Sequence, residues 1–216
     1  MRLPLAFTTK ATCMIRTALE FIKRELDAYM VAREQDPANY VLGSVVDLLP
    51  VISPNGDINI NDSKHITLML AGMEEERNEG KRPYFMSTDD SQLKRLNPPV
   101  NINLYVLFIA SNGNYETALR DCSSVISFFQ ANPVFDETRF PNLNASALDP
   151  ANKPWQLVER LSFKLQDMTF EQQNNLWAML GGKYIPSVVY KVNMLTAFET
   201  KSDQVGAPIN ELNYNS

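Results

Sequence analysis

The 216-residue sequence contains a single histidine and only two cysteines. Cys13 and Cys122 are far apart, and neither belongs to a CxxC motif or has a histidine nearby. We therefore expect no metal site and no redox-active dithiol, and a reducing cytoplasm is the default compartment. We interpret Cys122 as a small buried hydrophobic residue.

Long apolar runs and an excess of positive charge are also missing. The longest strongly apolar run covers residues 105–110, far short of the ~20 residues that a transmembrane helix needs. Lys10 interrupts the short apolar patch near the start, which argues against a secretory signal. With a net charge of −5, the chain lacks the excess of basic residues that nucleic-acid binders have. We expect neither membrane insertion nor a nucleic-acid partner.

The remaining composition is that of an ordinary globular protein. Hydrophobic residues make up 44% and charged residues 21% of the chain, which is enough to form a core. The length fits one domain with short appendages. We expect an N-terminal arm at residues 1–13, a domain at residues 14–199 and a polar C-terminal tail at residues 200–216.

Helical periodicity occurs in three places. From Met14 onward, apolar residues recur every three or four positions until Asp36-Pro37 stops the pattern. Asn114 can cap a second helix. We expect one apolar stripe on this second helix, formed by Tyr115, Ala118, Leu119, Cys122, Ile126 and Phe129.

The third helix has clear start and stop signals. Thr169 and Gln172 have the spacing of a capping box, and Gly181-Gly182 resembles a C-terminal stop. Its apolar face comprises Leu176, Trp177 and Leu180.

Extended runs separate these helices. Residues 41–60 indicate two extended runs around a turn at 54–57. The first half of 65–78 favours a strand, with a short helix as the alternative. Residues 100–111 are the strongest strand, and their continuously apolar second half indicates a central strand covered on both faces. Residues 156–168 alternate as a half-exposed strand does, and residues 187–199 indicate a final strand. Residues 79–99 indicate an exposed loop or protruding hairpin, and residues 133–154 a long irregular crossover. The sequence therefore predicts a single α/β or α+β domain, with a mixed sheet flanked by about three helices.

Signals for catalysis are weak. His65 is the one histidine that a nucleophilic triad could use, and no nucleophile motif accompanies it, so a structural or exposed His65 is favoured. Glu74–Glu76 form the densest carboxylate group, for which we favour a solvated strand end, with one glutamate paired to Arg77 or a neighbouring chain. A small hydrolase built on these glutamates and His65 remains an alternative. We expect no catalytic residue, no cofactor and no metal.

Three stretches in one order resemble a known family. They are "MIRTALEFIKRELDAYM", "NYETALRDCSSVISFFQANPVF" and "NNLWAMLGGKYIPSVVYKV". Together they are similar to the tube-cap, or terminator, proteins of contractile injection systems, which are phage-tail-like bacterial particles. The resemblance covers most of residues 14–196.

The resemblance implies an assembly role rather than catalysis. Such proteins are related to phage tail terminators, and form a six-membered ring on the baseplate-distal end of the inner tube. They cap the tube, bind the last sheath layer and end tube and sheath growth. The implied partners are other copies of the chain, the tube protein and the sheath protein. Assembly would occur in the cytoplasm, with the chain then part of a released or membrane-anchored particle. The alternative is a monomeric adaptor for a sheath or effector protein.

Large amphipathic residues and a shaped turn are the best interface candidates. The first group surrounds the turn "GGKYIP" and comprises Trp177, Gly181, Gly182, Lys183, Tyr184, Pro186 and Tyr190. The alternative for this group is that Trp177 and Tyr184 are core residues and the two glycines only end a helix. The second group consists of Arg82, Tyr84, Phe85, Lys94 and Arg95, for which the alternative is a solvated loop.

Overall fold

The structure is a computed structural model that describes residues 14–53, 55–60, 64–76, 84–87, 93–96, 101–147, 157–196 and 205–206. The predicted arm lies outside these residues, as does the predicted tail apart from residues 205–206. The elements are α1 (Met14–Glu34), β1 (Val46–Leu48), β2 (Ile66–Glu75), β3 (Tyr84–Ser87), β4 (Leu93–Leu96), β5 (Asn101–Ala110), α2 (Tyr115–Ala131), β6 (Val134–Asp136), β7 (Val158–Leu165), α3 (Phe170–Met179), β8 (Ser187–Thr196) and β9 (Val205–Gly206).

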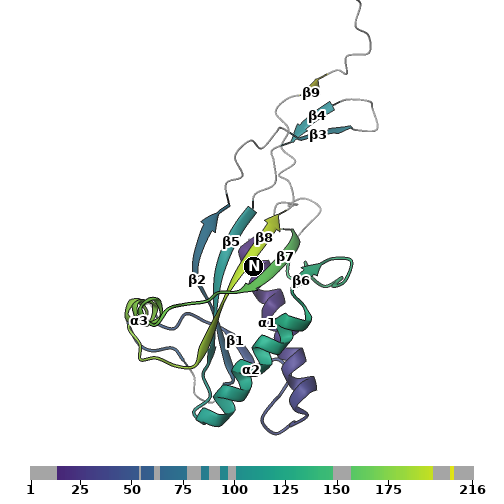
Figure 1. The fold of residues 1–216 in the computed structure, drawn as a ribbon. Coiled ribbons are helices and arrows are strands. Elements are labelled where there is room, and N and C mark those ends of the chain that lie inside the picture. Colours follow the sequence, from purple (N-terminus) through teal and green to yellow (C-terminus); the bar gives the residue numbers. More distant parts are fainter. Residues whose placement is uncertain are drawn as a thin grey trace, which may run out of the picture.

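The main sheet has six strands in the order β1-β2-β5-β8-β7-β6 (Figure 1). β1 pairs parallel with β2, and every other neighbouring pair is antiparallel. The predicted mixed α+β fold is therefore confirmed. β3 and β4 pair antiparallel and are joined by β9 in a second small sheet, so within the predicted range 79–99 residues 84–87 and 93–96 form the strands of a hairpin rather than a loop.

The two faces of the main sheet are covered differently. On β5, Leu104, Val106 and Phe108 belong to the large core beneath α1 and α2. Leu107 and Ile109 belong to a smaller cluster with Trp177 of α3. Because neighbouring residues of a strand point to opposite faces, α3 lies on the other side of the sheet from α1 and α2.

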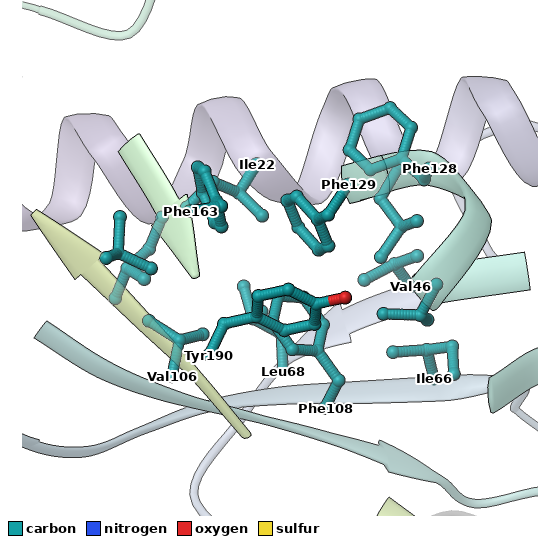
Figure 2. Packing of buried hydrophobic residues seen from close by; sticks show 14 of the residues in the cluster. Ile22, Val46, Ile66, Leu68, Val106, Phe108, Phe128, Phe129, Phe163 and Tyr190 are labelled. Atoms are coloured by element: carbon teal, nitrogen blue, oxygen red, sulfur yellow. The ribbon is translucent and has the colours of Figure 1, made fainter. Parts of the chain in front are cut away.

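Aromatic rings fill the large core. Figure 2 shows Phe129 of α2 above the sheet side chains Phe108 and Tyr190, with Phe163 beside it. The Phe129 ring centroid is 4.2 Å from that of Phe163 and 4.6 Å from that of Tyr190. Tyr190 thus packs inside the subunit, beneath α2.

Asp27 of α1 connects that helix to the start of the sheet. Its buried carboxylate accepts hydrogen bonds from the backbone N–H groups of Gly43, Val45 and Val46, at 2.6, 2.8 and 3.0 Å. Gly43 has φ +86°, a left-handed conformation that favours glycine. This contact leads the chain from the end of α1 into β1.

The predicted apolar stripe of α2 is partly wrong. Ala118 and Phe129 are buried and Cys122 is half-buried, but Tyr115, Leu119 and Ile126 are exposed. Burial raises the pKa of the Cys122 thiol to about 11, as expected of a largely apolar environment. The inward face of α2 includes the fully buried polar residues Asp121 and Ser124. Apolarity alone therefore did not identify the face that packs on the sheet.

Three other segments have a different secondary structure from the one that the sequence pattern predicts. β2 continues through its acidic half to Glu75, because that half pairs with β5 as far as Ile102. Among the described residues of the range 41–60, the extended pairing consists of β1 and a bridge between Ile52 and Ile58 around the predicted turn. The crossover at 133–154 begins with β6, which adds an edge strand to β7.

Candidate interface site

Trp177 attaches α3 to the sheet. It is the one buried residue of that helix and packs in a cluster with Val51, Leu107, Ile109 and Val189. Only 4% of its surface is exposed. The packing therefore agrees with the core alternative for Trp177, and little of the residue is available to another chain.

The double glycine ends α3 as the sequence indicates. Gly181 has φ +62°, a conformation that side chains rarely adopt. A Cβ atom on Gly182 would lie 3.5 Å from the Trp177 ring, an ordinary van der Waals contact, so the chain here runs beside the indole without requiring a glycine. The capping box at the other end is also present, since Thr169 and Gln172 bond reciprocally. α3 is thus fixed at both ends.

The rest of the predicted turn presents side chains to solvent. Lys183 is exposed, and Tyr184 is 58% exposed while its ring contacts the Trp177 edge at 6.1 Å between centroids. The Pro186 carbonyl accepts a hydrogen bond from the Ala110 N–H at 2.9 Å, which leads the turn into β8. Tyr190, next along the strand, is 4% exposed in the large core. Of this candidate group, Lys183 and Tyr184 are the residues best placed to touch a partner.

Four of the five residues of the second candidate group lie on the small sheet. Tyr84 and Phe85 belong to β3, and Lys94 and Arg95 to β4. Their positions pair Phe85 with Arg95 and Tyr84 with Leu96 across the hairpin. Arg82 and the side chains of the other four lie outside what the structure describes, so their predicted contact with sheath or tube stays a prediction.

The three-glutamate group sits at the far end of β2. Glu74 accepts hydrogen bonds from Lys191 at 2.9 Å, from the Tyr105 hydroxyl at 2.9 Å and from Asn103 at 3.3 Å. The Lys191 bond, followed by the Tyr105 bond, lowers the pKa of Glu74 below its usual range. A carboxylate held ionised in this way is a poor general acid. The observed partner is Lys191 on β8, and Arg77 lies outside the described residues.

His65 lies at the opposite end of the same strand. It immediately precedes β2, whereas Glu75 ends it, and ten extended residues span about 33 Å. The two groups on which the hydrolase alternative depends are therefore too far apart to act on one substrate.

A buried polar network surrounds His65, which the sequence did not reveal. Its Nδ1 lies 2.8 Å from Asp121 Oδ2, and its Nε2 lies 3.1 Å from the Asn39 carbonyl. Tyr40 stacks on the imidazole, at 4.0 Å between ring centroids, and donates its hydroxyl proton to Asp121 Oδ1 at 2.7 Å. Arg120 donates to the Tyr40 oxygen at 2.9 Å and pairs with Glu34 at 3.3 Å. The network connects α1, α2 and the start of β2, as a structural histidine would.

The electrostatics of this network favour a protonated His65. Burial lowers the pKa of His65, but the hydrogen bond and negative charge of Asp121, together with the Asn39 carbonyl, outweigh it. The pKa of His65 is therefore raised above its ordinary value of 6.5. An imidazolium ion can donate to both acceptors, and neutral imidazole to only one. Burial also raises the pKa of the Tyr40 hydroxyl, which stays protonated.

We predict that this pKa shift makes stability depend on pH. A folded-state pKa above the unfolded one gives stability that is fully present below about pH 6.5 and is lost as pH rises through the folded-state pKa. Urea unfolding of the wild type between about pH 6 and pH 9 should show this loss. His65→Gln, which does not titrate, should be less stable at pH 6 and show a flatter profile. An unchanged pH slope in the variant would contradict the assignment.

Two kinds of feature are absent from the described residues. No group of three or more His, Cys, Asp or Glu side chains there is arranged to hold a metal ion. Among the described helices, none has the length and apolarity needed to cross a membrane.

Comparisons with known proteins give a family match and several structural matches, two of which are described here. The family model of the Pvc16 N-terminal domain matches residues 17–211. The first structure is the PVC sheath/tube terminator in the extended state, from an extracellular contractile injection system; it has 13% identity and a TM-score of 0.51, over 88% of this chain and 62% of that chain. The second is the tube-terminating cap of the anti-feeding prophage, with 15% identity and a TM-score of 0.52, over 88% and 61%. No curated protein matches the sequence. The chain thus spans about three fifths of the length of either structure.

Proposed function

The chain belongs to the Pvc16 N-terminal domain family, and from this premise we propose that it is a structural cap of a contractile injection system. It forms a ring that closes the baseplate-distal end of the inner tube. The ring binds the last sheath layer and ends the growth of tube and sheath.

One observation carries this proposal. The fold of 88% of this chain is shared with two proteins whose names are sheath/tube terminator and tube-terminating cap. At 13% and 15% identity the likeness establishes the fold, and the family match over residues 17–211 adds independent support for a common role. The proposal extends that role to this chain.

The site geometry supports an assembly role over the hydrolase alternative. His65 is held inside a buried network, and Glu74 is ionised and paired with Lys191 about one strand length away. By contrast, the outer surfaces of α2 and α3 carry exposed apolar side chains, a common feature of protein–protein contacts.

The partners follow from the role. We propose a homo-oligomer, with six copies as in the family to which the sequence is similar, in contact with the tube and sheath proteins of one particle. Assembly takes place in the cytoplasm, and the chain then remains part of the particle. The monomeric adaptor is the alternative, and native mass spectrometry of the purified chain distinguishes it, because the cap forms a ring and the adaptor does not.

Deleting the gene tests the cap function directly. We expect particles whose tubes and sheaths have a broad length distribution or fall apart, because nothing ends their growth. Electron microscopy of negatively stained particles gives the length distribution, and expression of the wild-type chain in the deletion strain should restore it. Intact particles with an unchanged, narrow length distribution would contradict the proposal.

A further inference from the structure

α2 carries a ridge of apolar side chains on its outer surface. Tyr115, Leu119 and Ile126 are 64%, 45% and 37% exposed, and half-buried Cys122 lies between them. The spacing of four, three and four residues places all four side chains on one side of the helix. We call these four residues the α2 ridge.

The charged residues of the outer surface of α2 are confined to its first half. Glu116 and Arg120 are exposed there, and Arg120 is held by Tyr40 and Glu34. The other exposed positions outside the ridge are Ser123, Gln130 and Ala131, which are uncharged. Depletion of charge around exposed apolar residues distinguishes the centre of a protein interface from ordinary surface. The helix also buries Asp121 and Ser124 on its inner face, so its outward apolar residues are not explained by core packing.

α3 carries a hollow on its outer surface. The hollow has a volume of about 480 Å³ and lies between α3 and the turn that follows it. Its lining includes Phe170, Trp177, Ala178, Gly182, Lys183 and Tyr184. Phe170 is 91% exposed, which is unusual for a phenylalanine that has no partner. We call this feature the α3 hollow.

The ridge and the hollow face opposite ways. α2 covers one face of the main sheet and α3 the other, so the two features cannot meet within one subunit. A head-to-tail contact between subunits needs two different surfaces of this kind, and its repetition with a fixed rotation closes a ring.

The charges beside the two features are complementary. Glu116 follows Tyr115 at the start of the ridge, and Lys183 borders the hollow next to Tyr184. Both side chains are exposed, and neither has an ion-pair partner within the described part of the chain. A subunit whose ridge enters the hollow of its neighbour would bring one carboxylate and one ammonium group to the edge of an apolar contact.

We propose that the α2 ridge of one copy docks into the α3 hollow of the next, and that this contact joins the subunits of the ring. The inference rests on the proposed ring and names the surfaces that build it. The occupant of the hollow is a second copy of this chain.

Substitutions on each feature test the contact with the full chain. Leu119→Asp with Ile126→Asp gives a ridge variant, and Phe170→Asp with Tyr184→Asp gives a hollow variant. A buried unpaired charge should weaken the contact at least about tenfold in either variant, so that native mass spectrometry shows monomers. Thr138→Asp, in the exposed turn after β6, is the matched control and should keep the wild-type ring. Circular dichroism and thermal unfolding must show that the variants remain folded.

Mixing the two variants gives a sharper result. Each mixed pair retains one intact hollow, on the ridge variant, and one intact ridge, on the hollow variant. A head-to-tail contact therefore predicts that the mixture forms a heterodimer and stops there. A contact between identical surfaces predicts instead that the variant which keeps that surface intact still associates with itself in the absence of the other variant. Monomers only in the mixture, with both variants folded, overturn the proposed contact.

Exchanging the two charged residues tests whether Glu116 and Lys183 pair at the border of the proposed contact. Glu116→Lys and Lys183→Glu should each weaken the ring, and the double variant should restore it, because the pair is then reversed. Failure of the double variant to restore the ring counts against the proposed register. If the wild-type chain is itself monomeric, the proposed ring fails. If the wild type and both surface variants all form rings, only the ridge-and-hollow contact fails.

Discussion

Replacing Asp121 with alanine is expected to destabilise the folded protein by about 3–5 kcal/mol, the usual effect of leaving a buried charge without its partner. Asp121 is fully buried and accepts hydrogen bonds from both His65 and Tyr40. Its removal leaves the Nδ1–H of the protonated imidazole and the buried Tyr40 hydroxyl without their acceptor. Urea unfolding near pH 6, where His65 is protonated, measures the loss.

Controls on the same helix separate the network from helix propensity. Ser123→Ala, at an exposed position two residues on, should change stability by no more than about 0.5 kcal/mol. The double variant Asp121→Ala, His65→Gln should be less destabilised than the sum of the two single variants, because it removes both members of one pair. A cost below about 1 kcal/mol for Asp121→Ala would mean that the network contributes little to the fold.

Replacing Trp177 with alanine is expected to cost about 3–5 kcal/mol, the range for loss of a buried large aromatic side chain. Trp177 is the one buried residue of α3 and packs against Leu107, Ile109 and Val189. Without it α3 should detach from the sheet, so hydrogen exchange of the α3 amides should accelerate more than that of β5. Denaturant unfolding and hydrogen exchange of the same sample measure both effects.

Two further variants sharpen this test. Met179→Ala removes an exposed apolar residue of the same helix and should change stability by no more than about 0.5 kcal/mol. Trp177→Phe keeps a ring and removes an indole N–H that is buried without an acceptor among the described residues, so it should cost less than the alanine variant. If Trp177→Ala leaves the monomer at wild-type stability but abolishes rings, Trp177 is an interface residue and not a core residue.

The sequence predicted well where local patterns decide the structure. The bounds of α1 follow from its apolar spacing and from Asp36-Pro37, and both caps of α3 were visible in Thr169, Gln172 and Gly181. β5, the most apolar strand, lies inside the sheet as its composition indicates.

The sequence was a poor guide where contacts between distant segments determine which residues are buried and which form strands. From the sequence of α2, Asp121 would be expected on the surface. Its burial is favourable because His65 and Tyr40, which are distant in sequence, hydrogen-bond to its carboxylate in the folded protein. The stripe that includes Leu119 and Ile126 has the same apolarity as a core stripe, so the pattern could not show that it faces outward. The acidic end of β2 is a strand because β5 and Lys191 lie beside it, which no local signal shows.

In the candidate site, the local turn could be predicted from the sequence, whereas the burial of the large aromatic residues could not. Gly181 and Gly182 were expected to shape a turn, and the positive φ angle of Gly181 shows how the chain turns at the end of α3. Trp177 and Tyr190 are residue types that often anchor protein interfaces, but both are buried within the subunit. Lys183 and Tyr184 remain exposed, and the further surface on α2 emerges only from the three-dimensional arrangement.

Imaging the distal end of the particle tests the central claim most directly. Cryo-electron microscopy of assembled particles should show six copies of this chain in one ring on the last layer of the inner tube, in contact with the last sheath layer. In that ring the α2 surface of each copy should face the α3 surface of the next. Density for the chain at the baseplate, along the sheath or as isolated single copies would contradict the account.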